Sequence, residues 1–136
     1  MSFNLSEFKR FEKQIILKKI GISGQKKIKK SKVLIIGMGG LGCPLLSYLA
    51  SAGIYNIGIV DHDKVELSNL NRQILFNTAD LGKYKVLQAK SKINKIYKGI
   101  KIRTFNQKVL TTNIKNISKD YDIICDGTDN FNTRYL

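Results

Sequence analysis

The segment Gly37-Met38-Gly39-Gly40-Leu41-Gly42 is the part of this sequence best suited to binding phosphate groups. Glycines let backbone N–H groups approach an anion closely at the start of a helix, where unpaired amides point outward. An acidic residue, Asp61, follows a second apolar run, in the position where nucleotide-binding βαβ units hold a ribose hydroxyl. We therefore expect Gly37, Gly39, Gly40, Gly42 and Asp61 to contact a nucleotide.

A long polar stretch after Asp61 supplies positive charge for the same purpose. Arg72 lies there between two amide side chains, and a guanidinium group binds phosphate through two parallel hydrogen bonds. Lys85 opens the next helical pattern and adds a point charge. The sequence thus predicts that Arg72 and Lys85 hold a triphosphate, although a solvated surface position is the alternative for a lysine in so lysine-rich a chain.

The segment from Asp126 to Asn130 follows another apolar run and contains two carboxylates. Because the carboxyl ends of parallel strands face the ligand, and Mg²⁺ prefers oxygen ligands, we expect Asp129 to bind Mg²⁺. A helix N-cap is the alternative role for Asp129, and the two roles are compatible. His62, the single histidine, has no catalytic partner in the sequence pattern and is interpreted as a loop residue.

The apolar periodicity shows which elements position these residues. Short apolar runs alternate with helical patterns, which predicts strands over 33–36, 57–60, 101–105 and 121–125, and helices over 40–52, 83–97 and 111–118. A helix over 6–17 with Ser6 as N-cap precedes them, followed by chain breaks at Gly21 and Gly24 and a basic helix over 25–30.

This alternation predicts an α/β fold, a Rossmann-like, mostly parallel sheet with flanking helices. We expect an N-terminal helical segment over 1–30 and an incomplete nucleotide-binding domain over 31–136. The sheet is expected to be truncated after its fourth strand, since a helix opens near 130 with no room to continue.

Composition excludes several classes of function. The net charge of +14 comes mainly from lysines spread along the chain, and only four arginines are present, which favours a solvated surface over a nucleic-acid site. No apolar run is long enough for a membrane span, and the N-terminus does not resemble a signal peptide. Two cysteines, Cys43 and Cys125, are too few for a disulfide framework. We expect a cytoplasmic protein that binds neither nucleic acid nor membrane.

From Arg10 to Leu136 the chain resembles the ThiF/MoeB/HesA family, bacterial relatives of the ubiquitin-activating enzymes. The resemblance rests on the glycine turn together with the segments 10–14, 61–63, 68–73, 82–85 and 126–130. It implies ATP-dependent adenylation of the C-terminal glycine of a ubiquitin-like sulfur-carrier protein of the thiamine or molybdopterin type. ATP and Mg²⁺ would be the cofactors, with zinc only if further sequence supplies Cys-x-x-Cys pairs. The full-length form would be a homodimer.

The same resemblance implies roles for individual residues. The glycine turn would hold the phosphates, Asp61 the ribose and Asp129 the Mg²⁺, while Arg72 and Lys85 would neutralise phosphate charge. Further nucleotide contacts are implied for Asp63, Asn69, Gln73 and Asn130. Lys13 stands where the family usually has an arginine that reaches into the partner subunit's site.

Two other classes of function remain open at this point. An NAD-dependent oxidoreductase would use the glycine turn and Asp61 equally well, although no Tyr-Lys or His-Asp catalytic arrangement is evident. An inactive remnant that retains nucleotide affinity is the other alternative.

Overall fold

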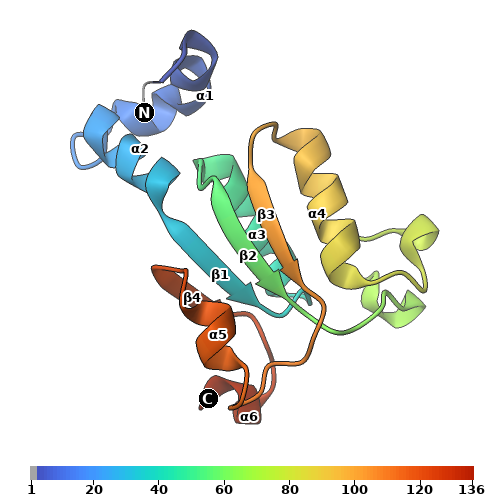
Figure 1. Ribbon diagram of the computed structural model, residues 1–136. Coiled ribbons are helices and arrows are strands. Elements are labelled where there is room, and N and C mark those ends of the chain that lie inside the picture. The colour runs from blue at the N-terminus through green and yellow to red at the C-terminus, as the bar shows by residue number, and fades with distance from the viewer. Residues whose placement is uncertain (1–2) are drawn as a thin grey trace.

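The computed structural model describes residues 3–136 and contains one parallel sheet of four strands in the order β3-β2-β1-β4 (Figure 1). The strands are β1 (Lys32–Ile36), β2 (Asn56–Val60), β3 (Lys101–Phe105) and β4 (Ile123–Asp126). The chain builds the sheet outward from β1 to β3 and then returns to place β4 on the other side of β1. This reversal creates a crevice at the carboxyl ends of β1 and β4, where open α/β sheets bind ligands. The predicted Rossmann-like fold is confirmed.

Helices cover the two faces of the sheet unequally. One face packs against α3 (Gly42–Ala52) and α4 (Lys85–Ile96), which contribute Leu46 and Ile93 to the larger apolar core. The other face packs against the short α5 (Ile114–Ser118), with Ile117 in a smaller core. The chain then passes β4 and ends in α6 (Phe131–Arg134) near the carboxyl ends of the strands (Figure 1).

An N-terminal arm of two helices, α1 (Leu5–Ile15) and α2 (Gly21–Lys30), lies at the amino ends of the strands (Figure 1). The predicted N-cap Ser6 is wrong, because the Asn4 side chain accepts from the Glu7 amide and Glu7 accepts in return from the Asn4 amide. The chain does break before α2, and Gly21, with φ +56°, stands at this break as the first residue of the helix. The predicted break at Gly24 is wrong, because Gly24 lies within α2, where burial of Gln25 and Lys29 overrides the weak helix propensity of glycine.

Three other helix starts differ from the sequence prediction by two or three residues. The helix predicted from 111 begins at Ile114, because the Asn113 side chain accepts from the Leu110 amide and forms a turn first. The helices predicted from 40 and 83 begin at Gly42 and Lys85. Strand bounds agree within two residues, since buried apolar runs between polar residues define them well.

Glutamine side chains fix the arm to the end of α3. Gln14 Nε2 and Gln25 Nε2 donate to the Ala52 carbonyl oxygen over 3.1 and 2.8 Å, and Gln14 also donates to Gln25 Oε1. The last carbonyls of a helix lack partners within the helix, so these bonds complete α3. Gly53 ends α3 with φ +100°, and a Cβ there would lie 2.9 Å from the Phe11 ring. The arm is therefore packed onto α3 by both apolar and polar contacts.

Within residues 3–136, no helix has the length and apolar character needed to cross a membrane.

Candidate functional site

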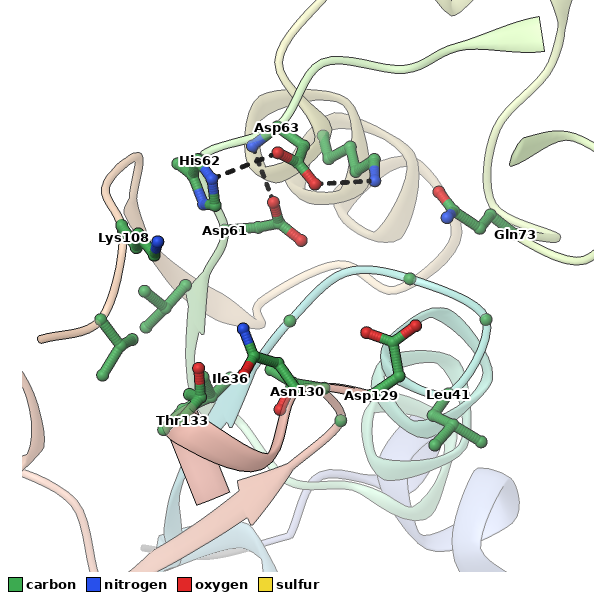
Figure 2. Close-up of a pocket in the computed structure, with 18 of the residues that line it drawn as sticks. Ile36, Leu41, Asp61, His62, Asp63, Gln73, Lys108, Asp129, Asn130 and Thr133 are labelled. Atoms are coloured by element: carbon green, nitrogen blue, oxygen red, sulfur yellow. Dashed lines mark hydrogen bonds and ion pairs between the residues drawn. The ribbon is translucent and has the colours of Figure 1, made fainter. Parts of the chain in front are cut away.

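A cleft of about 640 Å³ opens at the carboxyl ends of the strands, between the glycine turn, the loop after β2 and the segment after β4 (Figure 2). It brings together Arg72, Lys85 and Asp129, which come from three separate segments of the chain. The other predicted site residues that line it are Gly37, Gly39, Gly40, Asp61, Asp63, Asn69, Gln73 and Asn130.

The glycine turn presents donors without partners to this cleft. Gly37, with φ +94°, donates its amide to the Val60 carbonyl, which holds the turn against the end of β2. No side chain caps the start of α3, and the amides of Gly39, Gly40 and Leu41 donate to no other residue between 3 and 136. Such unpaired amides at a helix N-terminus form an anion-binding site.

Gly42 lies beneath the turn and does not line the cleft. A Cβ at Gly42 would lie 1.8 Å from the Gly37 carbonyl oxygen, so only glycine fits there. A Cβ at Gly127 would lie 3.2 Å from Gly42 Cα, so the turn also packs closely on the chain after β4. The structure thus gives Gly42 a packing role in place of the expected direct contact with a nucleotide.

Asp61 connects the glycine turn to the loop after β2. Its Oδ2 accepts from the Met38 amide over 2.7 Å, and its Oδ1 accepts from the Asp63 amide over 2.8 Å. Each carboxylate oxygen has a second lone-pair site, so Asp61 can still accept from a ribose hydroxyl. The residue is therefore both a positioning group and a candidate ligand contact.

Lys85 is buried, with a relative exposure of 5%, so the surface alternative for this lysine is wrong. Its Nζ lies 3.5 Å from Asp63 Oδ2, and the other oxygen of Asp63 faces His62 Nε2 at 3.3 Å (Figure 2). A cation at the first residue of a helix opposes the helix dipole, so Lys85 does not stabilise α4. Its placement fits an anion in the cleft.

Arg72 lies across the glycine turn. A Cβ at Gly40 would be 3.4 Å from Arg72 Cγ, which shows how closely the side chain passes the turn. Arg72 Nη1 donates to the Ser68 carbonyl and to Asn71 Oδ1. The guanidinium is exposed and keeps further N–H donors for a phosphate beside the Gly40 amide.

The short 3-10 helix Leu67–Asn69 sets the position of Arg72 in the loop. Asn69 Oδ1 accepts from the Glu66 amide over 3.0 Å, and the Asn69 carbonyl accepts from the Arg72 and Gln73 amides. Asn69 therefore supports the loop that carries both side chains to the cleft.

The segment after β4 brings Asp129 to the cleft. Asp126 Oδ1 accepts from the Thr128 amide and hydroxyl over 2.9 and 2.6 Å, which folds the chain over the strand ends. Burial raises the pKa of Asp126, but the bonds from Thr128 and from Arg134 more than offset this and hold it below its ordinary value. The N-cap of α6 is Asn130, whose side chain accepts from the Asn132 amide, so the N-cap alternative for Asp129 is wrong.

Two sets of oxygen ligands in the cleft could hold a cation. Asp61, His62 and Asp63 place ligand atoms within 4.8 Å of one another, but all four carboxylate oxygens there already accept from, or pair with, other groups. The Asp129 carboxylate has no hydrogen bond or ion pair to any residue of 3–136. Asp129 therefore fits Mg²⁺ better, because Mg²⁺ binds carboxylate oxygens and the negative charge of Asp129 is not already offset by a donor or cation of residues 3–136.

The cleft also contains residues that sequence reasoning missed. Gln107, Lys108 and Val109 follow β3, and Thr133 lies on α6. The position of the first three just after a parallel strand was a usable signal, because all such strand ends meet at one edge. Lys13 lies on the exposed side of α1 and does not line the cleft of its own chain.

Comparison with known proteins agrees with this geometry. A sequence model of the ThiF family matches residues 11–136. The chain belongs to the ThiF family.

We compared this ThiF-family chain with two curated relatives. It is 45% identical over 135 residues to a probable molybdopterin-synthase adenylyltransferase of Porphyra purpurea. The matched segment covers 99% of this chain and 35% of the relative. It is 38% identical over 136 residues to the sulfur carrier protein adenylyltransferase of Thermus thermophilus, covering 100% of this chain and 50% of the relative. The chain thus spans about a third to a half of these relatives.

Among solved structures, this ThiF-family chain is similar to E. coli MccB determined with ATP. The TM-score is 0.69 with 33% sequence identity, covering 74% of this chain and 30% of MccB.

Proposed function

We propose that this chain is the nucleotide-binding part of an ATP-dependent adenylyltransferase that acts on the C-terminal glycine of a ubiquitin-like sulfur-carrier protein. The observation that carries the proposal is the convergence of Arg72, Lys85 and Asp129 on one cleft beside the unpaired amides of the glycine turn. The names of the relatives, and the ATP in the MccB structure, support the same class of reaction.

In this reaction, a carboxylate oxygen of the carrier's terminal glycine attacks the α-phosphorus of ATP. A new bond forms between that oxygen and the α-phosphorus, the bond from the α-phosphorus to the bridging oxygen breaks, and pyrophosphate leaves. No protein nucleophile is needed, because the carrier supplies it. The enzyme contributes position and charge neutralisation.

Each residue of the cleft has a separate role in this reaction. The amides of Gly39 and Gly40 bind phosphate oxygens, and Arg72 and Lys85 neutralise the charge that develops on the leaving pyrophosphate. Asp61 holds the ribose, and Asp63 keeps the Lys85 ammonium in the cleft. Asp129 would hold Mg²⁺, which when bound supplies further charge neutralisation on the phosphates.

We also propose how two subunits assemble. Lys13 is exposed on α1, remote from its own cleft, as expected for a residue that acts in a second subunit. We include in the proposal a homodimer of the full-length form in which Lys13 adds a cation to the partner's triphosphate site. Zinc is included only for a form that carries Cys-x-x-Cys pairs.

The test is carrier-dependent exchange of labelled pyrophosphate into ATP. Exchange should require both Mg²⁺ and a carrier with its terminal glycine, and a carrier that lacks this glycine is the matched control. Equal exchange with both carriers would contradict the proposed substrate. Nucleotide binding without any exchange would support the inactive remnant.

An NAD-dependent oxidoreductase is a weaker candidate. The two phosphates of NAD carry less negative charge than a triphosphate. The cleft brings together three cationic side chains, Arg72, Lys85 and Lys108, and an uncommitted carboxylate suited to Mg²⁺.

A further inference from the structure

The side-chain oxygen of Gln73, Oε1, has no hydrogen-bond donor in the described part of the chain. Gln73 is only 4% exposed, and its Oε1 is the one buried side-chain polar atom of residues 3–136 without a hydrogen-bond partner. A buried acceptor without a donor costs free energy, so native proteins contain few of them. The cost is tolerated where a ligand supplies the missing bond.

The position of Gln73 shows which part of a ligand it would meet. Its side chain lines the cleft, and its Nε2 lies 3.7 Å from where a Cβ of Gly39 would be. Figure 2 shows the carboxamide head directed toward the cleft, with the glycine turn between Gln73 and Asp129. Gln73 therefore faces the phosphate end of the site.

The backbone holds Gln73 in this place. Its amide donates to the Asn69 carbonyl over 2.9 Å, and its carbonyl accepts from the Phe76 amide over 3.0 Å. The residue is thus fixed at both ends, and its head group stays beside the turn.

Phosphate oxygens only accept hydrogen bonds, so the phosphates themselves cannot satisfy Gln73 Oε1. The carboxylates of Asp61 and Asp63 are acceptors as well. A donor does arrive with a metal-bound triphosphate, because Mg²⁺ keeps several of its water molecules when it binds phosphates in proteins. A water bound to Mg²⁺ is a strong donor, since the metal polarises its O–H bonds.

We propose that Gln73 Oε1 accepts a hydrogen bond from a water molecule of the hydrated Mg²⁺ and so couples magnesium to nucleotide binding. This inference rests on the proposed function. Asp129 is the direct ligand of the ion and Gln73 contacts its hydration shell. Such a shell extends about 2.1 Å to the water oxygen and about 2.8 Å further to an acceptor, and both residues line the same cleft.

The test compares ATP affinity with Mg²⁺ and with a chelator, by calorimetry, for the wild-type chain and Gln73→Leu. In Gln73→Leu, affinity without Mg²⁺ should stay within about twofold, while the gain from Mg²⁺ should fall by about tenfold, as for one lost bond to a charged group. The ligand-free variant should melt no lower than the wild type, because it removes an unpaired buried atom. Gln88→Leu, at a half-buried glutamine of α4 that does not line the cleft, is the matched control and should change neither affinity.

Gln73→Asn is the second variant, because it keeps the carboxamide but withdraws it by one methylene group. It should lose the magnesium gain as Gln73→Leu does. An equal loss of affinity with and without Mg²⁺ would overturn the inference, since Gln73 would then contact the nucleotide or support the turn. An unchanged magnesium gain would overturn it as well. A wild-type chain that does not bind ATP with Mg²⁺ at all would contradict the proposed function itself.

Discussion

Two buried lysines, one at each end of the sheet, are held very differently. Lys29, in the N-terminal arm, is 8% exposed and pairs at 2.5 Å with Glu7, itself largely buried. Lys85, in the cleft, is 5% exposed but lies 3.5 Å from an Asp63 whose side chain is 54% exposed. A buried ammonium needs a close counter-charge, so Lys29 is satisfied by the fold, whereas Lys85 is satisfied only in part.

The same difference extends to the other polar groups of the two regions. In the arm, Gln14 and Gln25 share the Ala52 carbonyl, and the Tyr55 hydroxyl donates to Glu7 over 2.9 Å. Burial, together with this bond to Glu7, raises the pKa of Tyr55 to about 12. In the cleft, Gln73 Oε1 and the Asp129 carboxylate have no partner among residues 3–136. The paired polar groups stabilise the arm, whereas the unpaired polar groups of the cleft are available to bind a ligand.

We expect the largest effect from a substitution in the cleft, which should lower activity and leave stability nearly unchanged. Arg72→Ala should lower carrier-dependent pyrophosphate exchange by about 10³-fold or more, because arginines that neutralise phosphate charge contribute roughly 10³–10⁵ in rate. Its unfolding free energy, from urea titration, should change by no more than about 0.5 kcal/mol, as for other exposed positions. Arg103→Ala, at an exposed arginine paired with Asp120, is the control and should leave exchange unchanged. A comparable loss in both variants would mean that charge in general, and not the cleft, drives the reaction.

We expect the next largest effect from a substitution in the arm, which should lower stability and leave ATP binding unchanged. Phe11 is 1% exposed and packs against Gly53, so Phe11→Ala should lower the unfolding free energy by about 3–5 kcal/mol. ATP affinity of the folded fraction should be retained. Phe8→Ala, at a residue 41% exposed, should cost much less. Loss of ATP affinity in a well-folded Phe11→Ala chain would show that the arm and the cleft do not act independently.

Two alanine substitutions in the glycine turn should separate packing from ligand contact. A Cβ at Gly42 would overlap the Gly37 carbonyl, so Gly42→Ala should cost about 1–3 kcal/mol of stability and weaken ATP binding by shifting the turn. At Gly39 the nearest atom to a Cβ is Gln73 Nε2 at 3.7 Å, so Gly39→Ala should fold normally. Thermal melting and ATP titration of both variants measure this. Equal destabilisation would show that the tight contact at Gly42 is not what requires glycine.

The smallest effect concerns pH and belongs to the arm. Burial raises the pKa of Glu7, but hydrogen bonds from Lys29, Tyr55 and Asn4 outweigh it, so the pKa lies below its ordinary value of 4.5. A carboxyl group with a lowered pKa stabilises the fold above its unfolded-state pKa, and this contribution is lost as pH falls through the folded-state value. Glu7→Gln should therefore be less stable than wild type at about pH 7, and the difference should shrink toward about pH 3. Urea titrations at several pH values check this, and a difference that does not change with pH would contradict it.

The sequence predicted the strands and the convergence of the cleft because both follow from local pattern and one topological rule. Arg72, Lys85 and Asp129 each stand where parallel strand ends and their loops must meet. The burial of Lys85 and the orphaned oxygen of Gln73 were not predictable, since both depend on how the loop after β2 packs against α4 and the turn. The N-cap at Asn4 was missed although its capping box with Glu7 is a local signal in the sequence. The start of α2 was mispredicted because tertiary contacts of the arm outweigh the weak helix propensity of glycine.

The central claim is that the cleft is built for a magnesium-bound nucleoside triphosphate. Calorimetric titration of the purified chain with ATP and Mg²⁺, compared with NAD under the same conditions, tests it most directly. We expect saturable binding of ATP at one site and NAD binding weaker by about tenfold or more, a difference of about 1.4 kcal/mol. NAD binding as tight as ATP binding, or no ATP binding, would contradict it.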